Sequence, residues 1–438
     1  MQRKMGDNVS GKDAVRMHEH FQGKIETIPK CWISGLEDFA VWYTPGVAEA
    51  CKAILSEKDK VFDLTLKWNT IAVVSDGTRV LGLGNIGPEA ALPVMEGKAL
   101  LFKYLGGVDA IPLCLNTQDE GKIVEIVKAV EPSFGGINLE DIEKPKCFSL
   151  LERLKSELSI PVWHDDQQGT ATIVCAGLIN ALKVVGKKLG DVKVAMVGVG
   201  AANVSVERLI VKAGVDERKI VMVDSKGILS RNRRDLEKNE PYKWSLCLRT
   251  NSEGKDGGIA EALEGADVCI AMSRQGPGVI KKEWVKKMND KPVLFSCANP
   301  IPEIWPYEAK EAGAKVVATA RSDFPNQLNN SLVFPGIFRG ALDVRAKGIS
   351  DEMCLAAAYE IAEMAEEKGL SEEYIVPTME EWDVYPREAA AAAYQACLEG
   401  LARKKTSKKE EYEYAREIIF NARRKFEQLK LSGLISRP

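Results

Sequence analysis

Short apolar runs alternate with longer amphipathic segments along the first 165 residues of the chain. Short runs predict buried strands, whereas apolar residues that recur every three or four positions predict helices. The predicted strands are 70–75, 79–81, 111–115, 134–139 and 160–163, and the predicted helices are 88–105, 121–130 and 150–158. Because strands and helices alternate, we expect a largely parallel sheet.

The alternation resumes after a long apolar segment, 170–185, which predicts a helix. Further strands are predicted at 192–197, 220–223, 268–272, 293–296 and 316–319, with a helix at 204–213. From Asp351 onward the pattern is helical and rich in Ala, Glu and Lys, and we expect these helices to pack back on the first domain. The polar residues 1–30 are predicted to form a helical arm.

A chain of 438 residues is too long for a single hydrophobic core. We therefore predict an α/β fold with two domains, at residues 1–165 and 166–345, followed by a C-terminal helical segment at residues 346–438.

Composition and charge narrow the functional classes. The net charge of −3 is spread over interspersed residues of both signs, so nucleic acid is not expected as a partner. No apolar run approaches the ~20 residues of a membrane-spanning helix, and the polar N-terminus does not resemble a signal peptide. The 10 Cys include no C-x-x-C pair, which favours reduced thiols and a cytoplasmic protein. With only three His, a His-rich zinc centre is excluded.

Two acidic pairs are the first candidates for chemistry. Glu140-Asp141 and Asp165-Asp166 each follow an apolar run, so both are expected at strand ends, where α/β folds bind ligands. Carboxylates held close repel unless a cation lies between them, and oxygen-only ligands suit Mg²⁺ or Mn²⁺. The alternative is that Asp165 or Asp166 caps the helix that begins near Thr170, with Glu140-Asp141 in a solvated turn. Two pairs at equivalent junctions favour the metal site.

Two glycine motifs compete as the dinucleotide site. Gly82 to Gly87 matches G-x-G-x-x-G literally, but only a three-residue strand is predicted before it. The segment 198–203 is an imperfect match, with Asn203 in the third glycine position, yet it lies between a full predicted strand and a helix. We therefore assign the dinucleotide to the second motif, namely Gly198, Val199, Gly200, Ala201 and Ala202. The first motif is interpreted as a tight structural loop near the substrate.

Asp224 ends the strand that follows the assigned motif. A carboxylate at this position binds the ribose hydroxyls of NAD and repels the additional phosphate of NADP. Nearby basic side chains are suited to binding that phosphate, namely Lys226, Arg231, Arg233 and Arg234. The sequence leaves the choice between NAD and NADP open.

Several motifs, in their order and spacing, resemble the malic enzyme family in its short prokaryotic form. They extend from about Phe39 to about Asp343 and are YTPGVAEA (43–50), SDGTRVLGLGNIGPEAALPVMEGKALLFK (75–103), INLEDI (137–142), HDDQQGTA (164–171), GVGAAN (198–203), ANP (298–300) and PNQLNNSLVFPGIFRGALD (325–343). The family glycine that Asn203 replaces is a departure from this pattern.

The resemblance implies oxidative decarboxylation of malate to pyruvate and CO₂ with NAD or NADP and Mg²⁺ or Mn²⁺, and decarboxylation of oxaloacetate. It also implies a homodimer whose interface includes the N-terminal arm. The roles that it implies are Tyr43 as general acid, Lys98 as general base and substrate contact, Asp165 as catalytic helper, Glu140, Asp141 and Asp166 as metal ligands, Arg79, Asn329 and Asn330 as substrate contacts, and Asn299 as a cofactor contact.

Each of these roles has a simpler structural alternative. Lys98 acts as a base only if its pKa falls below the usual ~10.4, as burial and a nearby cation would cause, and the alternative is a surface lysine. Tyr43 is alternatively a packed aromatic beside Trp42 and Phe39. Arg79 suits a dicarboxylate but could pair with an acidic side chain of the chain itself. Asn329 and Asn330 could simply be polar loop residues.

Two other functions remain as alternatives. A malolactic enzyme would return the hydride to pyruvate and release lactate. A non-catalytic NAD(P)-binding regulatory protein would be expected to lack Lys98, Tyr43 or one of the acidic residues, and all of them are present.

Overall fold

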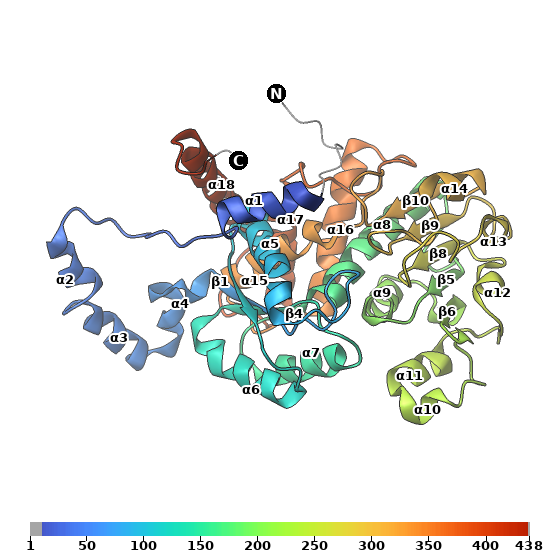
Figure 1. Cartoon of the computed structure of the whole chain (residues 1–438), viewed down its shortest axis with the longest axis horizontal. Coiled ribbons are helices and arrows are strands. Elements are labelled where there is room, and N and C mark those ends of the chain that lie inside the picture. The colour runs from blue at the N-terminus through green and yellow to red at the C-terminus, as the bar shows by residue number, and fades with distance from the viewer. Residues whose placement is uncertain (1–10, 437–438) are drawn as a thin grey trace.

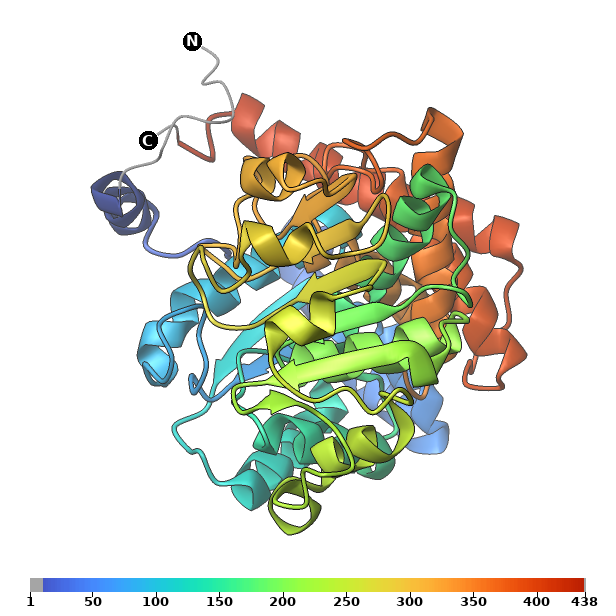
Figure 2. The ribbon, with the colours of Figure 1, turned by 90° about the vertical axis from the view of Figure 1, so that its right-hand side faces the viewer.

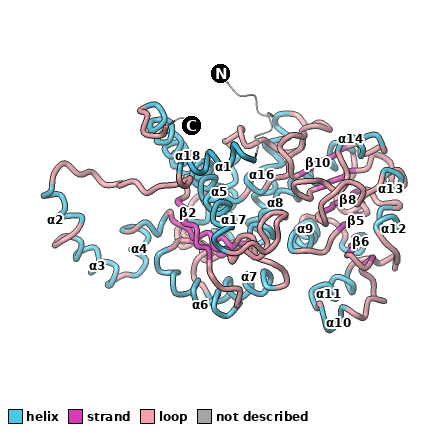
Figure 3. Tube along the Cα trace, in the orientation of Figure 1, coloured by secondary structure: helices cyan, strands magenta, loops and turns pink. Residues whose placement is uncertain are grey.

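The structure is a computed structural model that describes residues 11–436. One parallel sheet and one mainly parallel sheet, each flanked by helices, make up its body (Figure 1). The α/β fold class predicted from the alternating pattern is confirmed. The two sheets, whose strands are magenta in Figure 3, are joined by a long helix, α8 (Thr170–Val185).

The first sheet has the order β2-β1-β3-β4, and all of its strands are parallel. Apolar side chains on its two faces pack against helices from different parts of the chain, α6 and α7 on one face and α5 and α15 on the other. The strands are β1 (Thr70–Ser75), β2 (Asp109–Cys114), β3 (Gly136–Leu139) and β4 (Val162–His164), and the helices are α5 (Pro88–Gly106), α6 (Glu120–Val130) and α7 (Lys146–Glu157).

The predicted strand at 79–81 is wrong. The chain makes only an isolated bridge between Val80 and Gly84 there, inside a loop that returns to Gly77. Ile86 and Gly87 donate backbone hydrogen bonds to the Gly77 carbonyl, at 3.1 and 3.3 Å. A segment of three residues, only two of them apolar, is too short to form a strand beside a glycine-rich turn without a neighbouring strand to pair with.

The second sheet has the order β10-β9-β8-β5-β6-β7 and faces the viewer in Figure 2. It is parallel except for β7. Its strands are β5 (Val194–Val197), β6 (Ile220–Asp224), β7 (Gly227–Ile228), β8 (Val268–Ala271), β9 (Val293–Ser296) and β10 (Val316–Thr319). The strand order reverses direction at β5, between β6 and β8, which is where Rossmann-type sheets bind dinucleotides.

Short helices connect the strands of the second sheet. They are α9 (Ala201–Lys212), α10 (Leu236–Asn239), α11 (Pro241–Arg249), α12 (Ile259–Leu263), α13 (Lys282–Val285) and α14 (Pro306–Glu311). Single helical turns occur at η1 (Leu36–Asp38), η2 (Lys58–Lys60), η3 (Leu66–Trp68), η4 (Glu131–Ser133), η5 (Asp165–Gly169), η6 (Glu217–Lys219) and η7 (Asn330–Leu332).

Helix α8 is apolar and almost entirely buried. The segment Asp165–Val185 is long and apolar enough to cross a membrane, but 83% of its most apolar window is buried inside the folded chain. It therefore behaves as a core helix between the two sheets. The predicted domain border at residues 165 and 166 falls within the η5 turn that precedes it.

The C-terminal helices pack on the first domain, as predicted. Helix α18 lies against α5, where Arg423 stacks on Tyr104 with 4.6 Å between the guanidinium carbon and the ring centroid. Ser407 begins α18 by accepting a hydrogen bond from the Glu410 amide. The helices are α15 (Phe334–Asp343), α16 (Asp351–Lys368), α17 (Val384–Leu398) and α18 (Lys408–Leu431).

The N-terminal segment is helical over a shorter range than predicted. Helix α1 covers Gly11–Phe21, whereas 22–30 form no helix and residues 1–10 lie outside the described part of the chain. The chain then continues through α2 (Phe39–Trp42), α3 (Val47–Ser56) and α4 (Val61–Leu64). In Figure 1, α2 and α3 stand apart from the two sheets.

Candidate active site between the two sheets

The register of β3 and β4 brings the two acidic pairs together. Leu139 and His164 are aligned across the two parallel strands, so Glu140 and Asp165, which follow them, leave the sheet at the same edge. This is the carboxyl edge, where ligands bind in parallel α/β sheets. The predicted position of both pairs at strand ends is confirmed by the strand bounds.

Glu140, Asp141 and Asp166 form a cluster of carboxylates. One oxygen from each lies within 4.8 Å of the others, and Glu140 and Asp141 are buried. No side chain of the η5 turn caps the helix that follows, and buried side chains do not form a solvated turn, so the structural alternatives do not hold. Three carboxylates offer the all-oxygen donor set that fits Mg²⁺ or Mn²⁺.

Burial makes the charges of this cluster unfavourable without a counterion. Burial and the neighbouring Asp166 raise the pKa of Asp141 to about 7. Burial also raises the pKa of Glu140, against the opposing effect of Lys98. A divalent cation would stabilise the ionised form of both carboxyls, because it supplies the missing positive charge.

Lys98 is not a surface lysine. Its side chain is buried on α5, with Nζ 2.5 Å from Asp165 Oδ2 and 3.1 Å from Glu140 Oε1. The ammonium also lies 4.1 Å from the centroid of the Phe334 ring. Burial alone would lower the pKa of Lys98, but the carboxylates of Asp165 and Glu140 outweigh it and raise the pKa above its ordinary value. The expected lowering of this pKa by burial together with a bound cation stays a prediction, because burial without the cation does not lower it here.

Asp165 holds Lys98 in place. It is fully buried and accepts hydrogen bonds from Lys98 Nζ and from Trp163 Nε1, the latter at 3.1 Å. A Cβ at Gly169 would overlap the Asp165 carboxylate, so the adjacent turn needs a glycine. Asp165 thus orients the lysine, whereas Asp166 belongs to the carboxylate cluster.

The predicted substrate residues differ in how close they lie to Lys98 and Asp165. Asn330 Cβ is 3.2 Å from the position that a Cβ at Gly169 would occupy, which places Asn330 beside Asp165. Asn329 accepts a hydrogen bond from the Ser331 amide at 2.9 Å and so caps η7, as its polar-loop alternative predicts.

Arg79 is exposed at the edge of the cluster. Its backbone amide donates to the Asp141 carbonyl at 3.0 Å. Among the described residues, no acidic side chain forms an ion pair with Arg79. The guanidinium therefore remains able to bind a carboxylate of a substrate.

The loop between β5 and α9 has the geometry of a dinucleotide-binding turn. Gly198 has φ +96 and lies against the backbone of Met272, so a Cβ there would clash. The turn ends at Ala201, where α9 begins and directs its first amides toward the loop. Val199 and Ala201 are buried, and Gly200 has open space where a Cβ would be, so the backbone can approach a phosphate there.

Asn203 supports this turn although it replaces the family glycine. Its buried side-chain amide donates to the carbonyls of Val197 and Gly198, at 3.0 and 2.8 Å. A glycine at this position allows the helix and the strand to pack closely. Asn203 instead makes two hydrogen bonds to the loop backbone.

The literal glycine motif, Gly82 to Gly87, is a structural loop, as predicted. No full strand precedes it, and a side chain at Gly82 would overlap Gln275, which belongs to the second sheet's connections. The loop therefore lies where the two halves of the molecule meet.

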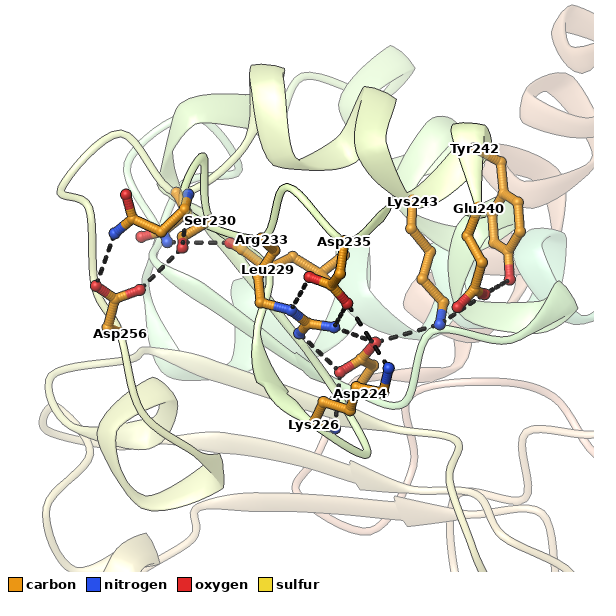
Figure 4. A network of polar contacts seen from close by, with 12 residues as sticks. Asp224, Lys226, Leu229, Ser230, Arg233, Asp235, Glu240, Tyr242, Lys243 and Asp256 are labelled. Carbon is orange, nitrogen blue, oxygen red and sulfur yellow. Dashed lines mark hydrogen bonds and ion pairs between the residues drawn. The ribbon is translucent and has the colours of Figure 1, made fainter. Parts of the chain in front are cut away.

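Asp224 is enclosed by basic groups (Figure 4). Arg233 reaches both of its oxygens, at 3.1 and 3.4 Å, and Lys243 Nζ lies 3.2 Å from Oδ2. The Lys226 amide donates to Oδ1 at 2.9 Å. Although burial opposes it, these contacts lower the pKa of Asp224, which stays ionised with its charge compensated. Asp224 therefore repels a 2′-phosphate less than an unpaired carboxylate would.

The family resemblance also places Asn299 and Tyr43 at the site. Asn299 is exposed just beyond the carboxyl end of β9, before a cis peptide to Pro300. Tyr43 follows the last residue of α2 and is 70% exposed, so it is not a packed aromatic. Helix α2 stands apart from the two sheets (Figure 1).

Sequence reasoning missed several neighbours of the site. Phe334 lies under the Lys98 ammonium, and His164 is fully buried with Nδ1 3.9 Å from Asp166 Oδ2. Phe334 and His164 lie within motifs that carried the resemblance, and that was the available signal. Lys243, the second partner of Asp224, had no signal because it is 19 residues further along the chain.

Comparisons with known proteins agree with this geometry. Residues 22–155 match the family model for the malic enzyme N-terminal domain, and residues 167–398 match that for the malic enzyme NAD-binding domain. The chain is 51% identical to the bifunctional malic/malolactic enzyme of Bacillus subtilis, covering 90% of this chain and 94% of that protein. It is 51% identical to the NAD-dependent malic enzyme of Geobacillus stearothermophilus, covering 88% and 79%.

A solved structure of the Entamoeba histolytica malic enzyme superposes with a TM-score of 0.94 at 47% identity, covering 97% of this chain and 89% of that one. The two family models together span most of the chain, and the fold agrees over nearly its whole length. The chain therefore belongs to the malic enzyme family.

Proposed function

We propose that this enzyme oxidises (S)-malate with NAD or NADP and decarboxylates the product to pyruvate and CO₂, with Mg²⁺ or Mn²⁺ held by Glu140, Asp141 and Asp166. The observation that carries the proposal is the buried Lys98–Asp165 pair beside three clustered carboxylates. Such a centre joins a proton acceptor to a site for a hard cation, and both lie near the dinucleotide turn. The same centre supports decarboxylation of added oxaloacetate.

The groups at the edge of the carboxylate cluster are suited to bind the substrate. The free guanidinium of Arg79 would bind one malate carboxylate as a fork, and Asn330 would donate to an oxygen of the substrate. When bound, the cation would polarise the carbon-2 oxygen, and the dinucleotide would accept the hydride from carbon 2.

Lys98 then accepts the hydroxyl proton of malate. To do so it must be neutral, and in the structure its charge is stabilised by Asp165 and Glu140. Engagement of Glu140 with a cation would weaken that stabilisation, while Asp165 keeps Nζ in position. Phe334 shields the same ammonium from water on one side.

Loss of CO₂ leaves an enol that needs a proton at carbon 3. Tyr43 would supply it, as the family resemblance implies. This assignment requires the phenol to reach a Lys98 centre, and the segment that carries Tyr43 does not place it there within one chain.

A spectrophotometric assay tests the proposal. Malate and Mn²⁺ are supplied with NAD and NADP in parallel, and reduced cofactor and pyruvate are measured. We expect both to appear in equal amounts and to vanish with a chelator. Malate turnover without reduced cofactor, or full activity in a chelator, would contradict the proposal.

Lys98→Ala should lower kcat by about 10²- to 10⁴-fold, because general base catalysis is lost, while NAD(P) still binds. Lys183→Ala, at an exposed lysine of α8, is the control and should leave turnover unchanged. Binding of the dinucleotide is followed by fluorescence titration. Turnover like that of wild type in Lys98→Ala would disprove the base assignment.

A second candidate function is malolactic activity, favoured by the likeness to the bifunctional malic/malolactic enzyme of Bacillus subtilis. It would regenerate NAD from the hydride and release lactate instead of pyruvate. Measuring lactate against pyruvate in the same assay separates the two outcomes.

We also propose a cytoplasmic homodimer without nucleic acid or membrane partners. All 10 cysteines are free thiols, which supports a reducing compartment.

A further inference from the structure

Lys144 connects the two halves of the molecule at the dinucleotide turn. It follows Asp141 in the loop between β3 and α7, and so belongs to the first domain. Its Nζ donates to the carbonyl of Val199, at 3.4 Å, in the turn between β5 and α9 of the second domain. A cation from the domain with the carboxylate cluster is therefore directed at the loop that has the geometry to hold a dinucleotide.

Packing across the two domains fixes the backbone that carries Lys144. Ile142, two residues earlier, lies in one apolar cluster with Ala201, the first residue of α9. On the other side of Lys144, Phe148 of α7 lies against Tyr242 of α11, with 5.1 Å between the ring centroids. Because the backbone is held on both sides, the side chain of Lys144 starts from a defined position beside the turn.

The Lys144 ammonium has no counterion within the described chain. Among residues 11–436, no acidic side chain forms an ion pair with it, and the Val199 carbonyl is uncharged. The neighbouring carboxylates of Asp224 and Glu240 are bound instead by Lys243 Nζ, at 3.2 and 2.7 Å (Figure 4). The positive charge of Lys144 is therefore left uncompensated at this turn.

The surroundings make that charge unfavourable. Lys144 is exposed as a residue, but its contact with the turn is partly buried. Partial burial, and after it the cation of Lys243, lower the pKa of Lys144 against the opposing effect of Glu240. An anion bound here would stabilise the ammonium, because it supplies the missing negative charge.

The phosphates of a dinucleotide are the anions that suit this turn. Gly200 has open space where a Cβ would be, and α9 directs its first amides toward the loop. Lys144 approaches the same turn from the opposite domain. A lysine ammonium binds phosphate as a point charge, so it complements backbone amides that supply only partial charges.

We propose that Lys144 binds a phosphate of NAD or NADP, so that the domain with the carboxylate cluster also holds the cofactor. The proposal rests on the proposed function, in which NAD or NADP occupies the turn between β5 and α9. The diphosphate and the 2′-phosphate of NADP share the required chemistry, since Lys144 neighbours both the turn and the groups around Asp224. Fragments of the cofactor distinguish these two phosphates.

A purely structural latch is the alternative to a phosphate contact. In that case the hydrogen bond from Lys144 to Val199 would only hold the two domains together. Loss of a latch would weaken the binding of every ligand of the cleft alike. Loss of a phosphate contact weakens only the binding of ligands that carry the phosphate.

Lys144→Gln should raise the Kd of the dinucleotide by about ten- to a hundredfold, because a contact to a charged phosphate is lost. Fluorescence titration of the full chain with NAD and with NADP, without malate or metal, measures this effect. Lys144→Arg keeps the charge and should bind close to wild type. Lys128→Gln, on α6 of the same domain, is the matched control and should bind like wild type, since Lys128 pairs with Glu157. Equal affinities of wild type and Lys144→Gln for both dinucleotides would overturn the proposal.

ADP and 2′-AMP, used as competitors of the dinucleotide, identify the phosphate. ADP carries the diphosphate without the 2′-phosphate, and 2′-AMP carries the 2′-phosphate without the diphosphate. In Lys144→Gln, a loss of affinity for ADP assigns Lys144 to the diphosphate, and a loss for 2′-AMP assigns it to the 2′-phosphate. Adenosine has neither group and should bind both proteins equally. An equal loss for adenosine would show a structural latch and overturn the proposal.

Failure of this inference and failure of the proposed function give different results. A wild-type protein that binds neither NAD nor NADP would contradict both. A wild-type protein that oxidises malate, with a Lys144→Gln variant of equal affinity for the dinucleotide, would remove only the role of Lys144. Circular dichroism without cofactor checks that the variant is folded.

Discussion

At the scale of the residue, neighbours decide what each candidate side chain does. Asp165 and Asp166 are adjacent and chemically identical, yet one is fully buried against Lys98 and the other joins a carboxylate cluster. Their roles differ because the η5 turn directs consecutive side chains to different sides. The proposed metal ligand Asp166 and the residue that contacts Lys98, Asp165, therefore differ only in the direction of their side chains.

Asp166→Asn should weaken Mn²⁺ binding by at least about tenfold, because it removes one of three anionic ligands. Isothermal titration of the protein with Mn²⁺ measures this effect. Glu143→Gln is the control, since Glu143 lies near the cluster but outside it, and should bind Mn²⁺ like wild type. Equal affinities for all three proteins would count against the metal site.

Arg233→Gln should shift cofactor preference toward NAD. Without Arg233 the Asp224 carboxylate is less compensated, so it repels a 2′-phosphate and accepts from ribose hydroxyls. We expect the ratio of kcat/KM for NADP to that for NAD to fall by about tenfold, or ~1.4 kcal/mol.

Arg218→Gln is the matched control, because the Arg218 side chain is 74% exposed and pairs with Asp216 instead. An unchanged ratio in Arg233→Gln would show that Arg233 does not set the cofactor preference.

At the scale of the element, long periodic segments were predicted well, and so were most short strands, such as 293–296 and 316–319, with 79–81 as the exception. The helix predicted at 170–185 is α8, and the helix predicted at 88–105 is α5 to within one residue. Both have several turns of consistent pattern, whereas the failed strand at 79–81 had three residues and no partner strand. Pairing, which a local pattern does not contain, decides the state of so short a segment.

Helix α18 carries a buried acid that links its packing to pH. Glu411 is buried beside Asp343, and burial together with that neighbour raises its pKa to about 9. The folded chain thus holds a proton that the unfolded chain releases near its ordinary pKa of 4.5. Stability should therefore be fully present below that value and fall as the pH rises toward about 9.

Glu411→Gln should reduce this loss, because an amide does not titrate. The difference amounts to at most ~1.4 kcal/mol per pH unit. Urea unfolding at about pH 6 and about pH 8 measures it. Glu413→Gln, at an exposed position on the same helix, should keep the wild-type pH dependence. The same slope in Glu411→Gln would show that this carboxyl is ionised in the folded chain.

At the scale of the whole molecule, distant parts of the chain support helix α5, which carries the proposed base Lys98. Helix α5 carries Lys98 and packs on β1 and β2, and it is covered by α15 and α18 (Figures 1 and 3). The last helix of the chain therefore stabilises an element of the first domain.

Ile419→Ala should destabilise the protein by about 2–5 kcal/mol, because it opens a cavity where α18 meets the core. The adjacent Phe420 is 52% exposed, and Phe420→Ala should change stability by less than about 0.5 kcal/mol. Denaturant unfolding compares the two. Equal effects would show that α18 is not part of the core that holds α5.

The sequence by itself determined most of the local structure and the positions of the candidate site residues. Periodicity located most strands and helices, and motif context located both acidic pairs and the dinucleotide turn, because these signals lie within a few consecutive residues. Tertiary structure decided what depends on strand order, register and long-range packing. Lys98 meets Asp165 across 67 residues, and basic groups compensate the charge of Asp224. Tyr43 is 70% exposed although its motif resembles a catalytic one. Exposure is decided only in the folded chain, because it depends on which residues pack against each side chain.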